Sequence, residues 1–165
     1  MTAKVLVVLG TSSSVGKSLL VAGFCHLFAR KGIRVAPYKA QNMSNNAAVC
    51  PDGSEIGRAQ ATQAIASGLE PHVDMNPVLI KPEADARSQV VVMGRPWKTL
   101  DASEYYPKKD FLWEKATAAL DRLREEYELI IVEGAGSAAE LNLRKGDIVN
   151  MAIARYANAP VLLAG

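Results

Sequence analysis

KVLVVLGTSSSVGKS, residues 4–18, is the stretch of this 165-residue chain that decides its fold. The apolar run Val5–Leu9 predicts a buried strand, and the apolar positions of residues 18–30 recur at helical spacing. Between them, Gly10–Ser18 almost spells a phosphate-binding loop, but five residues separate its two glycines where the common pattern has four. A glycine-rich loop that leaves a buried strand and opens a helix is the context that a phosphate site requires, so we expect one here.

This loop carries the groups that a nucleotide phosphate chain needs. Backbone N–H groups of the loop and of the helix N-terminus can surround the phosphates, while Lys17 neutralises their outer charge and the Ser18 hydroxyl binds Mg²⁺. The residues predicted to hold the nucleotide are Gly10, Thr11, Ser14, Val15, Gly16, Lys17 and Ser18.

The rest of the chain alternates strand-like and helix-like segments. The predicted strands are residues 33–38, 78–80, 89–93, 129–132 and 160–164, the predicted helices are 55–67, 110–127 and 148–156, and residues 39–53 are a polar loop. Strands that are continuous apolar runs and alternate with helices indicate a parallel sheet covered by helices on both faces. We therefore expect an α/β fold of the P-loop NTPase class, with residues 1–165 forming one domain.

Composition excludes several classes of partner. Lys and Arg number 19 against 17 Asp and Glu, so neither nucleic acid nor an anionic membrane surface is expected. The apolar runs are far shorter than the roughly 20 residues that span a bilayer, and the N-terminus shows no signal-peptide pattern. The two cysteines, Cys25 and Cys50, fit neither a disulfide framework nor a metal spacing. We expect a soluble cytoplasmic protein.

The end of the chain is unusual for such a sheet. Residues 160–164 read as an interior strand, and functional loops follow the carboxyl ends of parallel strands. We therefore expect the domain to be truncated at its C-terminus, with part of the working protein beyond Gly165.

Charged residues follow two of the predicted strands. Glu133 ends an apolar strand at the place where P-loop proteins put a Mg²⁺ ligand, so Ser18 and Glu133 are the expected core of a metal site. Asp52 and Glu55 are the candidates for a further ligand, and we assign Asp52 to the metal site. Lys39 ends the second strand, hence lies at the same sheet edge, and can bind a γ-phosphate or a substrate carboxylate.

Uncharged hydrogen-bonding residues surround Lys39. Gln41, Asn42 and Ser44 suit the recognition of amide and carboxylate groups of a substrate, and we predict that they bind it. Turns are also rich in Asn for backbone reasons, which is the alternative interpretation of this segment.

Several stretches together resemble one family. The five-residue gap in residues 10–18 is similar to the modified phosphate-binding loop shared by dethiobiotin synthetase and the amidotransferases of cobalamin biosynthesis. Further stretches, which cover most of the chain, resemble the cobyric acid synthase family: VAPYKAQNMS at 35–44, PDGSEIGRAQ at 51–60, VDMNPVLIKP at 73–82, RSQVVV at 87–92 and VEGAGS at 132–137.

This resemblance implies a dethiobiotin-synthetase-like fold and an ATP- and glutamine-dependent ligase. Members of the family amidate the b, d, e and g carboxylates of adenosylcobyrinic acid a,c-diamide to give cobyric acid, through an acyl phosphate. ATP and Mg²⁺ are the implied cofactors, Lys17, Lys39 and Glu133 the implied catalytic residues, and Asp147 a residue facing the corrinoid. Family members take ammonia from a C-terminal glutaminase domain, which we expect to be absent from these residues. A homodimer is one oligomeric state that the resemblance leaves open.

Two rival functions stay open. A dethiobiotin-synthetase-type ligase also phosphorylates a carboxylate, although the Gln-Asn-Met-Ser stretch at 41–44 argues against it. A partition-type switch ATPase would bind partner proteins instead of transforming a metabolite. Such ATPases carry a further lysine near the start of the loop, and Thr11–Ser13 offers none.

Overall fold

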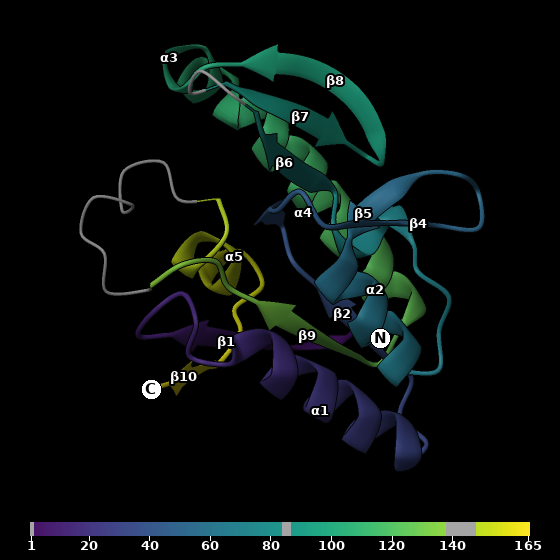
Figure 1. The fold of residues 1–165 in the computed structure, drawn as a ribbon. Helices are drawn as coiled ribbons and strands as arrows, with labels where there is room; N and C mark the ends of the chain where they lie inside the picture. The colour runs from purple at the N-terminus through teal and green to yellow at the C-terminus, as the bar shows by residue number, and fades with distance from the viewer. Residues whose placement is uncertain (1, 84–86, 138–147) are drawn as a thin grey trace.

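A computed structural model describes residues 2–83, 87–137 and 148–165. Its central element is a four-stranded parallel sheet in the order β10-β1-β9-β2 (Figure 1). The strands are β1 (Lys4–Gly10), β2 (Val35–Tyr38), β9 (Leu129–Glu133) and β10 (Val161–Ala164). The phosphate-loop strand is therefore an interior strand, as its uninterrupted apolar sequence predicts.

Helices cover both faces of this sheet. They are α1 (Lys17–Arg30), α2 (Arg58–Ala66), α4 (Lys109–Glu126) and α5 (Met151–Tyr156). Successive residues of β1 point to opposite faces: Val8 packs against Val21 and Cys25 of α1, whereas Val7 belongs to the core that contains Leu120 of α4 and Ile153 of α5. This alternation confirms the predicted α/β fold with both faces covered.

A second, mixed sheet lies apart from the first in the order β3-β6-β7-β8. Its strands are β3 (Gln41–Met43), β6 (Val78–Pro82), β7 (Ser88–Val92) and β8 (Arg95–Leu100), and only the β3–β6 pair is parallel. Helix α4 links the two sheets, because Leu112 packs on the second sheet and Leu120 on the first. Figure 1 shows β6, β7 and β8 at the end of the molecule opposite α1.

Short elements complete the chain. They are the antiparallel pair β4 (Ala47–Val49) and β5 (Glu55–Gly57), the 3₁₀ turns η1 (Val73–Met75) and η2 (Tyr106–Lys108), and the one-turn helix α3 (Ala102–Tyr105). Within the described ranges, no helix combines the length and apolar character needed to cross a membrane.

Several predicted boundaries were wrong. The helix predicted from residue 55 begins at Arg58, because Glu55–Gly57 pairs with Ala47–Val49 and the Gly57 N–H donates to Asn76 Oδ1. The segment 39–53, expected to be loop, contains β3 and β4. Strand β8 was not predicted, since its charges and proline gave no clean alternation, and the last helix begins at Met151 rather than at residue 148.

Candidate active site

The parallel sheet brings the predicted catalytic residues to one edge. Val8 of β1 pairs with Glu133 of β9, and Tyr38 of β2 pairs with Val132. Because the strands are parallel, the phosphate loop after β1, Lys39 after β2 and Glu133 at the end of β9 all emerge at the carboxyl edge. The edge therefore gathers residues that are far apart in the chain.

The phosphate loop opens directly into α1. Gly16 has φ 96° and ψ 14°, a left-handed conformation that favours glycine, and it lets the chain turn into the helix. Among the described residues, no side chain caps the N-terminus of α1, and its first turn holds no acidic residue. The first N–H groups of the helix and the positive end of its dipole are thus available to an anion.

Lys17 lies folded back along the loop. Its Nζ donates to the carbonyl oxygens of Ser12, at 2.7 Å, and Gly136, at 2.8 Å, and the residue is only 4% exposed. Burial lowers the pKa of Lys17, the ammonium of Lys39 lowers it further, and Glu133 opposes the shift. Each ammonium group disfavours the charged form of the other. A bound anion would offset this repulsion and stabilise both charged forms.

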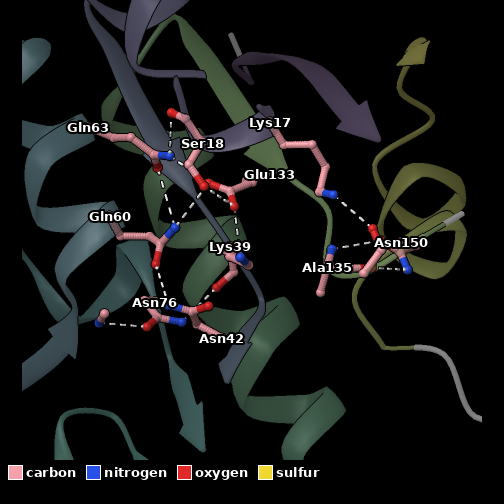
Figure 2. A network of polar contacts seen from close by, with 12 residues as sticks. Lys17, Ser18, Lys39, Asn42, Gln60, Gln63, Asn76, Glu133, Ala135 and Asn150 are labelled. Carbon is pink, nitrogen blue, oxygen red and sulfur yellow. Dashed lines mark hydrogen bonds and ion pairs between the residues drawn. The ribbon is translucent and has the colours of Figure 1, made fainter. Parts of the chain in front are cut away.

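Glu133 is the centre of a buried polar cluster (Figure 2). Its Oε1 accepts hydrogen bonds from Ser18 Oγ at 2.8 Å and from Lys39 Nζ at 2.7 Å. Its Oε2 accepts from Gln63 Nε2 at 2.6 Å and from Gln60 Nε2 at 3.3 Å. The side chains of Lys39 and Glu133 are 10% and 2% exposed, so this ion pair lies away from bulk water.

The backbone of Lys39 is fixed as well as its side chain. Its N–H donates to the carbonyl of Met75, and its carbonyl accepts from Asn76 Nδ2 at 3.0 Å.

The turn that follows β9 is held by Asn150, which accepts from the Ala135 N–H at 2.9 Å and donates to the Ala135 carbonyl at 3.0 Å.

A cavity of about 510 Å³ opens between this edge and the second sheet. Lys17, Ser18, Lys39 and Glu133 line one side. The facing side is formed by Gln41, Asn42, Met43, Tyr105, Tyr106 and Lys109, and the remaining lining residues include Ser13 and Asn150. Both the phosphate loop and a wall of mixed apolar and polar character therefore face the same space.

Other predicted site residues lie in different places. Gln41 accepts a hydrogen bond from the Tyr105 hydroxyl, and Asn42 donates to Gln60 Oε1 at 3.1 Å. Ser44 accepts from the Asn46 N–H and does not line the cavity. Asp147 lies outside the described residues.

Asp52 is apart from Glu133. It lies in the turn between β4 and β5, does not line the cavity, and accepts hydrogen bonds from the backbone and hydroxyl of Ser54. These hydrogen bonds lower the pKa of its exposed carboxyl group. Glu55, the alternative ligand, forms an ion pair with Lys81. A metal role for Asp52 stays a prediction.

Some cavity and cluster residues were not predicted. Tyr105, Tyr106 and Lys109 were assigned no function from the sequence, although two adjacent aromatic residues before a helix could have suggested a wall. Gln60 and Gln63 are 0% and 1% exposed, and both occupy the inner side of the predicted helix. Polar amides at inward positions of an amphipathic helix were the signal that could have identified them.

The donor set fits Mg²⁺. Ser18 Oγ and Glu133 Oε1 are hard oxygen donors 2.8 Å apart, beside the uncapped start of α1. In the described part of the chain, no group of three or more His, Cys, Asp or Glu residues forms a separate metal cluster. One carboxylate and one hydroxyl, completed by phosphate oxygens and water, is the usual magnesium arrangement at phosphate sites.

Gly10→Ala should weaken nucleotide binding about 10-fold or more, because overpacking costs roughly 1–3 kcal/mol. A Cβ at Gly10 would lie 2.5 Å from Val15 Cγ1 and 2.9 Å from Lys17 Nζ, so the loop would have to shift. Isothermal titration with ATP would measure the change. Gly23→Ala in α1 is the matched control, because a Cβ there meets no atom within 4 Å. Equal affinities for the two variants would contradict the prediction.

Comparison with known proteins agrees with this geometry. The model of the CobQ/CobB/MinD/ParA nucleotide binding domain matches residues 6–163. The chain is 60% identical to the cobyric acid synthase of Roseiflexus castenholzii and 61% identical to those of Chloroflexus aggregans and Desulforudis audaxviator. These alignments cover 100% of this chain but 34%, 34% and 33% of the relatives, so the chain spans about a third of their length.

The predicted resemblance to cobyric acid synthases is thereby confirmed. The match over residues 6–163 includes the phosphate loop, Lys39 and Glu133, which contribute residues to the cavity. The chain therefore belongs to the CobQ/CobB/MinD/ParA nucleotide-binding domain family.

Proposed function

We propose that this chain is the ATP-dependent synthetase part of an enzyme that amidates side-chain carboxylates of a corrinoid in cobalamin biosynthesis. The observation that carries the proposal is a cavity lined by Lys17 and Ser18 of the phosphate loop together with Lys39 and Glu133, with a facing wall suited to a large organic substrate. The names of the relatives support the same substrate class.

The chemistry explains why a phosphate loop and two lysines share the cavity. A carboxylate does not condense with ammonia in water, because hydroxide is a poor leaving group. In the proposed reaction a substrate carboxylate oxygen attacks the γ-phosphorus of ATP, and ADP leaves. Ammonia then attacks the carbonyl carbon of the acyl phosphate, and inorganic phosphate leaves. Lys17 and Lys39 neutralise charge on the transferring group and hold the two anionic reactants together.

Ser18 and Glu133 would hold Mg²⁺ in this reaction. The ion supplies charge neutralisation on the phosphate oxygens when it is bound. Glu133 has a second task in this scheme, because its Oε1 also holds Lys39 Nζ at 2.7 Å. The carboxylate thereby keeps the lysine at the sheet edge, where an incoming substrate carboxylate would meet it.

The facing wall suits a flat, anionic macrocycle. Met43 and Tyr106 are 63% and 62% exposed, and the ammonium of Lys109 lies 4.5 Å from the ring centroid of Tyr106. An exposed aromatic face can stack on a conjugated ring, and the adjacent cation can attract a peripheral carboxylate. Gln41 and Asn42 can form hydrogen bonds with amide groups that the substrate already carries. Ammonia would come from glutamine at a glutaminase domain of the whole protein.

Calorimetric titration of the purified chain with MgATP, with and without cobyrinic acid a,c-diamide, tests this function. We expect both to bind and the corrinoid to tighten nucleotide binding, since both occupy one cavity. Lys109→Ala should weaken corrinoid binding about 10-fold, as expected for losing one charge-assisted contact, and leave MgATP affinity unchanged. Lys108→Ala is the control, because Lys108 does not line this cavity. An MgATP affinity that is the same with and without the corrinoid would refute the substrate assignment.

A further inference from the structure

Gln60 and Gln63, the two buried glutamines of α2, contact Glu133, the carboxylate of the proposed metal site. Gln63 Nε2 donates both to Glu133 Oε2, at 2.6 Å, and to the Ser18 carbonyl oxygen, at 3.2 Å. It therefore connects the end of β9 to the first turn of α1. Figure 2 shows Gln60 and Gln63 of α2, Ser18 of α1 and Lys39 after β2 converging on Glu133.

The direction of these hydrogen bonds is fixed by chemistry. An ionised carboxylate only accepts hydrogen bonds, so both glutamines must turn their NH₂ groups toward Glu133. The carbonyl oxygen of Gln60 then points away and accepts from Asn42 Nδ2 at 3.1 Å. Asn42 lines the cavity, so a chain of amides runs from the cavity wall to the carboxylate.

The two oxygens of Glu133 consequently have different tasks. Oε2 is engaged by both glutamines on the buried side, whereas Oε1 faces Ser18 Oγ and Lys39 Nζ. Because hydrogen bonds hold Oε2, the carboxylate cannot rotate freely. The direction in which Oε1 points is therefore restricted. Such outer hydrogen bonds commonly orient a metal-binding side chain, and their loss costs 10- to 100-fold in metal affinity in other proteins.

We propose that Gln63, assisted by Gln60, is a positioning residue that holds Glu133 so that Oε1 and the Ser18 hydroxyl meet the magnesium of the bound nucleotide. The inference rests on the proposed nucleotide site and is independent of the corrinoid. Gln63 has the larger share, because its contact with Oε2 is 2.6 Å against 3.3 Å for Gln60, and because it also holds Ser18.

The test measures how much magnesium tightens nucleotide binding. The purified chain is titrated calorimetrically with the β,γ-imido analogue of ATP, once in MgCl₂ and once in EDTA, and the ratio of the two dissociation constants is the magnesium factor. We expect Gln63→Met, which keeps the volume but removes the N–H donors, to lower this factor roughly 10-fold or more without changing affinity in EDTA. Gln60→Met should lower it less.

Thr62→Ala is the matched control on the same helix, since Thr62 is exposed and its hydroxyl donates to the Arg58 carbonyl. A double-mutant cycle separates positioning from a structural role: in the Glu133→Gln background, Gln63→Met should cause no further loss of the magnesium factor. The proposal is overturned by an unchanged factor in both glutamine variants, by an additive loss in the cycle, or by a wild-type chain without a magnesium factor. Because no corrinoid is present, failure of the substrate assignment would leave these results unaffected.

Discussion

Lys17→Ala should abolish ATP turnover and weaken binding of the ATP analogue roughly 100-fold, because a charge-assisted contact with phosphate is worth about 1.5–3 kcal/mol. Lys17 Nζ donates to the carbonyl oxygens of Ser12, in the phosphate loop, and of Gly136, in the turn after β9. These neutral acceptors can be exchanged for phosphate oxygens at little cost. Burial lowers the pKa of Lys17 and the ammonium of Lys39 lowers it further, so a bound phosphate would favour the charged form of Lys17.

A thermal unfolding scan with the turnover assay distinguishes loss of function from loss of fold. Lys17→Ala should unfold close to the wild-type temperature, because the hydrogen bonds that Lys17 Nζ donates go to the neutral carbonyl oxygens of Ser12 and Gly136. Lys31→Ala, in the turn that ends the same helix, is the matched control and should retain turnover. Near-wild-type ATP turnover by the Lys17 variant would refute the assignment of this lysine.

The sequence was sufficient for the residues whose positions follow from a contiguous motif or from the end of a strand. The loop Gly10–Ser18, Lys39 and Glu133 were all predicted from their places next to apolar runs, and the parallel register then brings them together. Parallel topology makes such a prediction reliable, because every carboxyl end reaches the same edge.

The sequence alone could not predict the contacts that the second sheet and α2 make with the cavity and with Glu133. Tyr106 and Lys109 reach the cavity only because α4 packs with Leu112 on β6 to β8, and pairing between those strands is not encoded in local periodicity. Gln60 and Gln63 lie in the segment that the sequence predicts as a helix, yet only the tertiary packing of α2 beside β9 shows that a carboxylate lies opposite them. The assignment of Asp52 rested on its place in a turn between two predicted elements; Asp52 does not line the cavity, and its metal role stays a prediction.

Lys39→Met should destabilise the ligand-free protein by about 3 kcal/mol, at the lower end of the range for breaking a buried ion pair. The variant leaves the Glu133 carboxylate buried without its cation, and the remaining donors from Ser18, Gln60 and Gln63 compensate only in part. Urea denaturation measures the change, and Lys81→Met is the matched control. Lys81 forms an ion pair with Glu55 in which both side chains are more exposed, so its loss should cost at most about 1 kcal/mol.

The double variant Lys39→Met/Glu133→Gln decides whether the cost comes from the unpaired charge. A neutral amide at position 133 can still accept from Gln63, so we expect the double variant to regain most of the stability while remaining inactive. Equal destabilisation by Lys39→Met and Lys81→Met would contradict this reasoning, as would a double variant less stable than Lys39→Met. If the double variant regains stability but stays inactive, then Lys39 and Glu133 are needed for the reaction and not for folding, since a neutral pair would stabilise the fold as well.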